Sequence, residues 1–81
     1  MSIPAEAVMD RLVREHEEYR RLFEKHRSFE ERLQNLNTRL FLSDEEKVEA
    51  ITLKKQKLAL KDRMAEIARQ FADQEADRAG H

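Results

Sequence analysis

Apolar side chains recur at alternating intervals of three and four residues through the first half of the chain. The positions at these intervals form two rows, and eight of the ten are apolar or aromatic: Leu12, Tyr19, His26, Leu33 and Leu40 in one row, and Val8, Glu15, Leu22, Phe29 and Leu36 in the other. This alternation places both rows along one side of a helix, as in a coiled-coil seam. Pro4 fits a first helical turn, where its missing N–H needs no partner. The pattern therefore predicts one helix over about residues 4–38.

The helical pattern is interrupted between residues 37 and 43. Side chains that compete for backbone hydrogen bonds gather just before this point, at Asn35, Asn37 and Thr38. Ser43 is then followed three residues later by Glu46, and this capping box is the signature of a helix start. We therefore expect a second helix over about residues 44–77.

The second predicted helix carries two apolar arcs. On a helical wheel that advances about 100° per residue, one arc centres on Leu53 and faces the first helix. The expected hairpin seam consists of Leu12, Tyr19, Leu22, His26, Phe29, Leu33, Leu53, Leu60, Met64, Ile67 and Phe71. The other arc lies roughly 100–160° away from Leu53, and lysines lie between the two. This arc and its lysines form the expected interaction surface: Ile51, Leu58, Ala65, Ala72, Lys54, Lys57 and Lys61.

Two helices of similar length with a short connection predict an all-α fold, an antiparallel two-helix hairpin of the coiled-coil type. Residues 1–81 would form a single domain. Because a hairpin uses only one arc of its second helix, the other arc is covered either by lysine stems or by another chain. So small a core is marginal alone, so we expect another chain. A homodimer that forms a helical bundle is the simplest arrangement, and a higher homo-oligomer is the alternative.

The composition limits the chemistry more than it identifies a function. The 16 basic and 17 acidic residues of the 81 interleave among leucines, which is typical of long helices rather than of disorder. The absence of cysteine excludes disulfides and thiolate metal sites, and a single glycine excludes a glycine-rich phosphate loop. With no long apolar run and no secretory signal, we expect a cytoplasmic protein that does not enter a membrane.

The titratable residues match no catalytic or metal-binding pattern. His16 and His26 are ten residues apart, about 15 Å along a helix, which is too far to share a metal ion. His26 is better interpreted as a polar seam residue that fixes register. The carboxylates mostly have basic residues three or four positions away, as on a solvated helix face. We therefore expect no enzyme, no metal, no cofactor and no small-molecule substrate.

Two segments resemble a known family. The run LKKQKLALKD at residues 53–62 and the run EEYRRLFEKH at residues 17–26 are similar to the YdcH-like family of small bacterial proteins, a domain of unknown function. The resemblance covers about residues 12–68. It implies a bacterial cytosolic protein that forms a coiled coil or helical hairpin, and it implies no catalytic residue or cofactor.

These observations favour a non-catalytic interaction or scaffold module that forms homo-oligomers and binds a protein partner whose identity the sequence does not give. The alternative is a nucleic-acid-binding accessory protein that uses the basic stretch at residues 54–63. We disfavour nucleic acid because the whole chain is slightly acidic and no aromatic residue interleaves with these lysines.

Overall fold

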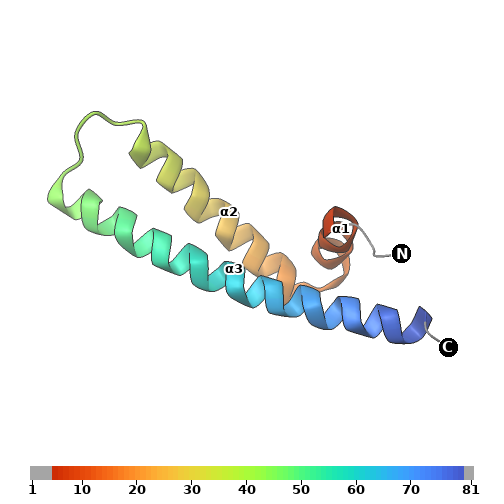
Figure 1. Ribbon diagram of the computed structural model, residues 1–81. Helices are drawn as coiled ribbons and strands as arrows, with labels where there is room; N and C mark the ends of the chain where they lie inside the picture. Colours follow the sequence, from red (N-terminus) through yellow and green to blue (C-terminus); the bar gives the residue numbers. More distant parts are fainter. Residues whose placement is uncertain (1–4, 80–81) are drawn as a thin grey trace.

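The computed structural model describes residues 5–79, which form three helices and no strand. Helices α2 (Glu17–Asn37) and α3 (Asp44–Ala79) lie side by side in antiparallel directions, joined by a loop (Figure 1). Helix α1 (Ala5–Glu15) leaves the line of α2 and crosses the hairpin at the end opposite the loop (Figure 1). The prediction of an all-helical fold is confirmed.

The single helix expected over residues 4–38 is wrong, because the chain bends at His16. His16 has φ −108° and ψ 107°, which is extended backbone between α1 and α2. Its Nδ1 atom accepts a hydrogen bond from the backbone N–H of Tyr19 at 3.1 Å, so the imidazole caps the start of α2. The expected two-helix hairpin is therefore a hairpin of α2 and α3 with a third helix folded across it.

The bend has a physical reason in Glu15. In one straight helix Glu15 would occupy a seam position, and burying an unpaired carboxylate there is costly. With the bend, the Glu15 side chain is 58% exposed and pairs with Arg11 Nε at 3.1 Å. Val8 and Leu12 of α1 can then pack against the hairpin while the Glu15 carboxylate stays in solvent.

The start of α3 follows the capping box. The N–H of Glu46 donates to Ser43 Oγ at 3.1 Å, and the Glu46 carboxylate accepts from the N–H of Ser43 at 3.0 Å. Residues 38–43 are outside any helix, so the break lies where the side-chain pattern predicts it. α3 then continues to Ala79, slightly beyond the expected end.

The core is thin and divided in two. One cluster lies where α1 meets the hairpin and holds Val8, Leu12, Tyr19, Met64 and Ile67. The other lies toward the loop and holds Leu33, Leu36 and Leu53. The molecule measures 58 × 21 × 17 Å and has a radius of gyration of 16.4 Å. A compact chain of this length would have about 12 Å, so the shape is a rod with little interior.

None of the helices among residues 5–79 combines the length and the apolar character that a membrane span needs.

Candidate interaction surface

Two bidentate ion pairs connect α2 and α3. Arg32 donates to Glu49 from Nε at 3.0 Å and from Nη2 at 2.9 Å. Arg63 donates to Glu18 at 3.1 and 3.2 Å in the same way. These hydrogen bonds lower the pKa of Glu49 and of Glu18 below its ordinary value. Fourteen residues separate the pairs along each helix, which is two heptads, so both pairs lie on one edge of the hairpin.

Ten of the eleven residues expected in the hairpin seam lie on α2 or α3, whereas Leu12 lies on α1, the helix that crosses the hairpin. Six of the eleven are buried: Leu12, Tyr19, Leu33, Leu53, Met64 and Ile67. Five are half-buried: Leu22, His26, Phe29, Leu60 and Phe71. Burial raises the pKa of the Tyr19 phenol. Leu40 continues the same row in the sequence, but it does not join the seam. It lies in the loop, and its side chain is 94% exposed.

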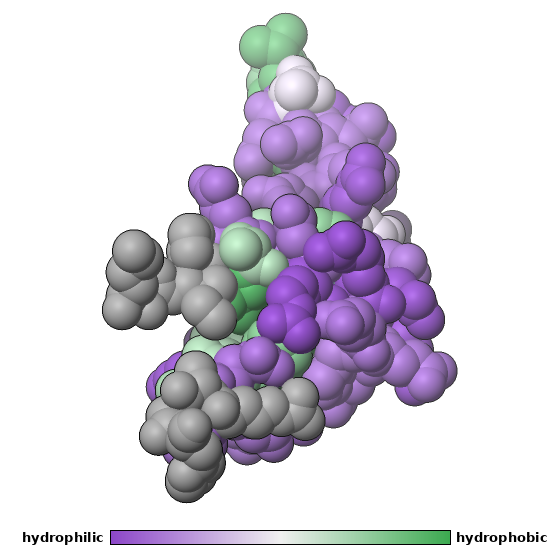
Figure 2. Space-filling model, turned by 90° about the vertical axis from the view of Figure 1, so that its right-hand side faces the viewer, coloured by the Kyte–Doolittle hydropathy of each residue, from purple (hydrophilic) through white to green (hydrophobic). Residues whose placement is uncertain are grey.

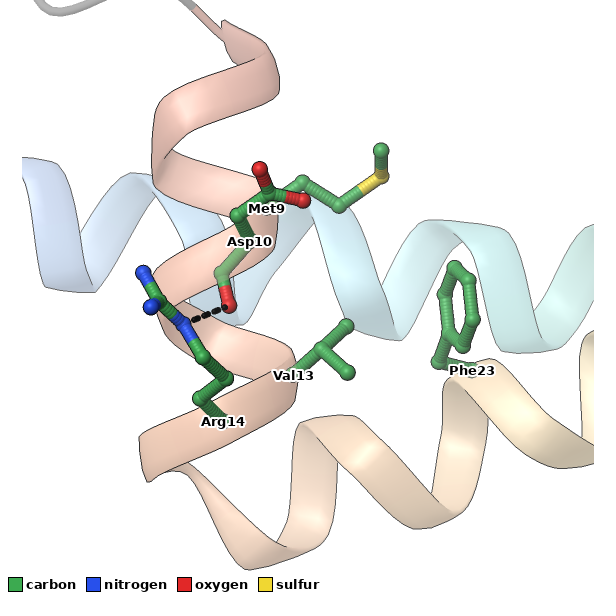
Figure 3. A pocket seen from close by; sticks show the side chains of 5 residues that line it. All are labelled: Met9, Asp10, Val13, Arg14 and Phe23. Atoms are coloured by element: carbon green, nitrogen blue, oxygen red, sulfur yellow. Dashed lines mark hydrogen bonds between the residues drawn. The ribbon is translucent and has the colours of Figure 1, made fainter.

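A groove opens where α1 crosses the hairpin. Its first part, of about 340 Å³, is surrounded by Met9 and Val13 of α1 and Phe23 of α2, with Asp10 and Arg14 on the outer side (Figure 3). Arg14 Nε donates to the backbone carbonyl of Asp10 at 3.3 Å (Figure 3). The apolar floor is visible between polar side chains from this end of the rod (Figure 2).

The second part of the groove, of about 280 Å³, reaches α3. It is lined by Met9, Tyr19, Phe23, His26, Lys61, Met64, Ala65 and Ala68. Because both parts share Met9 and Phe23, we treat them as one surface, the α1 groove. Lys61 lies about 160° around α3 from Arg63, so the groove and the ion pairs occupy opposite edges of the hairpin.

His26 lies in the wall of the α1 groove. Its Nε2 atom is buried without a hydrogen-bond partner among the described residues, and its Nδ1 atom is 4.0 Å from Glu30 Oε2. Buried polar atoms are normally paired, so an unpaired one beside a groove leaves a hydrogen-bonding position that water or a bound group can fill. The role of His26 as the residue that fixes the seam register stays a prediction.

The expected interaction surface is divided between the outside of the hairpin and the α1 groove, whose lining includes Lys61 and Ala65. Ile51 is 57% exposed and Leu58 is 59% exposed. Ala65, Ala72, Lys54 and Lys61 are exposed as well, and Lys57 is half-buried. Val48, one turn before Ile51, extends this row toward the start of α3. We call the row of Val48, Ile51 and Leu58 the outer face of α3.

The basic residues at positions 54–63 differ in whether they form ion pairs. Arg63 is engaged by Glu18 and by Glu66. The structure gives no ion pair within residues 5–79 to the lysines at positions 54, 55, 57 and 61. These lysines spread over more than one side of α3, because successive residues advance by about 100°.

The described part of the chain brings no three histidine, cysteine or acidic side chains close enough to hold a metal ion. The α1 groove was not expected from the sequence, although Met9, His16 and Phe23 flank the seam pattern. The sequence feature that could have indicated this groove is the pair of polar residues Glu15 and His16, which interrupts the apolar pattern at the bend.

A model of a protein family of unknown function, DUF465, matches residues 20–68, which include most of α2, the loop and two thirds of α3. The match supports membership of a small uncharacterised family, and the YdcH-like resemblance of the two sequence runs stays a prediction. Comparisons with curated proteins and with solved structures gave no match.

Proposed function

We propose that this chain, which belongs to the DUF465 family of proteins of unknown function, is a non-catalytic module of the bacterial cytosol that self-associates and presents helical surfaces to a protein partner. The observation that carries the proposal is the outer face of α3, where large apolar side chains lie in a row and more than half of each is exposed. Contiguous apolar patches on soluble proteins commonly mark interaction sites.

The thin core supports self-association. Only eight apolar side chains are buried among those the structure describes, and two of them, Leu12 and Leu36, are fully buried. A domain of this size gains little stability from such a core. A second copy is the simplest partner for such a chain, because two-fold dimers are the commonest closed assemblies.

The surface carboxylates support a role without catalysis. Glu18, Glu46 and Glu49 have lowered pKa values because they accept hydrogen bonds from Arg63, from Ser43 and from Arg32. Catalytic acids and bases instead tend to have a pKa tuned toward neutrality inside a cleft. These three pairings are those of a structural surface.

Sedimentation velocity at micromolar concentration tests the proposal. We expect the wild type to sediment as a dimer and Leu58→Glu to sediment as a smaller species, because the substitution places a charge in the contact. Gln56→Glu is the matched control, since it adds the same charge two residues earlier, about 160° around the helix. A monomeric wild type, or a Leu58→Glu variant as dimeric as the control, contradicts self-association through this face.

Nucleic-acid binding is the second candidate. The observation that favours it is that four of the five lysines of α3 have no ion-pair partner among residues 5–79: Lys54, Lys55, Lys57 and Lys61. Phosphate binding by these lysines would be sensitive to salt, because neutralising phosphates releases counterions. The test is a gel shift with duplex DNA and single-stranded RNA. A shift that weakens with salt and disappears when Lys54, Lys55 and Lys57 become glutamine would favour this candidate over a protein partner.

A further inference from the structure

We propose that a second copy packs antiparallel against the outer face of α3, with the two-fold axis between Lys54 and Lys55, and that the loop of each copy covers the α1 groove of the other. The inference rests on the self-association proposed above and adds the register of the dimer and the occupant of the groove. The loop means residues 38–43, which include the exposed Leu40 and Phe41.

The register follows from the outer face itself. Ile51 and Leu58 are seven residues apart, so they lie on nearly the same side of α3. When two copies of α3 run antiparallel, placing Ile51 opposite Leu58 of the second copy also places Leu58 opposite Ile51. Each large exposed side chain then meets another large apolar side chain, and Val48 extends the contact at both ends.

Charge complementarity agrees with this register. It sets Lys47 opposite Asp62 of the second copy, and the two-fold axis makes this pair twice. Lys47 is exposed and its ion pair within the chain, with Asp44, is long at 4.0 Å. Asp62 is also exposed, and no ion pair or hydrogen bond is found for it among the described residues. The unfavourable contribution is the repulsion between like charges at the centre, where Lys54 and Lys55 flank the two-fold axis. Their stems can lie over apolar surface while their charged groups stay in water, which reduces this repulsion.

The same register brings the loop to the α1 groove. Asp44, the first residue of α3, falls opposite Ala65 of the second copy, so the loop before Asp44 falls beside the turn from Ala65 to Ala68. Both alanines line the groove, and their small side chains leave room for a chain to approach. Leu40 and Phe41, which are 94% and 89% exposed, are then next to the apolar lining of the groove.

One interface thus covers every large apolar side chain that the described structure leaves exposed. These are Met9, Leu40, Phe41, Val48, Ile51 and Leu58. The alternative antiparallel register, with Ile51 opposite Ala72, does not achieve this. There the loop would extend beyond the end of the second copy's α3, and both Phe41 and the α1 groove would stay exposed.

Cysteine cross-linking tests the arrangement, because the chain has no cysteine of its own. We expect Phe41→Cys combined with Ala68→Cys to give a disulfide-linked dimer under mild oxidation. Within one chain these positions are separated by about 36 Å of α3, so a bond between them reports contact between copies. In the proposed register the two copies of Phe41 are about 40 Å apart, so Phe41→Cys alone should stay unlinked.

A charge exchange tests the register independently of disulfide geometry. Lys47→Glu alone and Asp62→Lys alone should each weaken dimerisation, by roughly tenfold in the dissociation constant for two surface pairs. The double variant should restore it. A monomeric wild type overturns the inference together with the proposed self-association. A dimeric wild type that gives neither the cross-link nor the restoration, or that cross-links through Phe41→Cys alone, overturns this register and leaves self-association standing.

Discussion

At the scale of single residues, His16 caps α2 at the point where the chain bends. Its Nδ1 accepts a hydrogen bond from the N–H of Tyr19, which requires that Nδ1 carry no proton. The bond satisfies one of the free N–H groups at the start of α2, and it lies at the extended residue where α1 turns away from α2. The bend at His16 separates the residues that α1 contributes to the α1 groove from those that α2 contributes.

Replacing the cap should loosen the bend. We expect His16→Ala to lower the free energy of unfolding by about 1 kcal/mol, because the N–H of Tyr19 loses its acceptor. His16→Asp should retain most of the stability, since aspartate is a good N-cap and its charge suits the helix N-terminus. Urea denaturation of the three proteins measures both effects. Equal midpoints for His16→Ala and the wild type would mean that the cap does not stabilise α2.

The capping box at α3 predicts how stability depends on pH. The N–H of Ser43 holds the pKa of Glu46 below its ordinary value of 4.5. A carboxyl group whose pKa is lowered by folding contributes stability above its ordinary pKa and loses it as the pH falls through the folded value. The urea midpoint should therefore fall on acidification below pH 4.5, and Glu46→Gln should reduce this fall. Glu45→Gln, at an exposed position without a hydrogen bond or ion pair in the described residues, is the control and should leave the profile unchanged.

At the scale of the helices, the two bidentate ion pairs are arranged with opposite polarity. At one position the acid is on α2, as Glu18, and at the other it is on α3, as Glu49. Sliding one helix by a heptad separates every partner, because the pairs are two heptads apart on both helices. Ion pairs this exposed contribute little stability, so their main effect is on register.

A double-mutant cycle on Arg32 and Glu49 measures that contribution. We expect Arg32→Glu and Glu49→Arg each to destabilise the protein, and the exchanged pair to recover most of the loss. The coupling energy should be about 0.5–1 kcal/mol, at the upper end for a surface pair because the geometry is bidentate. A coupling energy near zero would assign the register to apolar packing alone.

The sequence predicts those elements whose causes are local. Ser43 and Glu46 mark the start of α3 by themselves, and the wheel positions of Leu53 and Met64 follow from the helix period. The outer face of α3 is predictable for the same reason, since α3 is one continuous helix. The bend at His16 is not, because the apolar rows keep the same register before and after the polar pair Glu15 and His16. Whether the chain bends there depends on the cost of burying Glu15 against the gain of a longer seam, and the α1 groove follows from that balance.

At the scale of the whole molecule, the chain is a rod 58 Å long with two small apolar clusters. α3 alone accounts for nearly all of that length, because 36 residues rise about 54 Å. Every side chain of α3 is thus either in the single seam or at the surface. A rod of this kind gains interior only by packing lengthwise against another helix, which the outer face of α3 permits.

This geometry predicts that thermal stability depends on protein concentration. When folding is coupled to dimerisation, mass action raises the melting temperature as the protein becomes more concentrated. With an unfolding enthalpy of about 0.7 kcal/mol per residue, the rise should be about 4 °C for each tenfold increase in concentration. Circular dichroism melts between 2 and 200 μM, roughly the range in which dimers of micromolar affinity dissociate, measure this slope.

Two variants test whether the dependence of melting temperature on concentration comes from the outer face of α3. Leu58→Glu should remove the dependence on concentration and lower the melting temperature at 200 μM, roughly a hundredfold above micromolar affinity, because only the monomer's thin core remains. Gln56→Glu should keep the wild-type slope. A wild type whose melting temperature is independent of concentration would mean that the two small clusters suffice to hold the rod together, and that the exposed residues of α3 serve a partner other than a second copy.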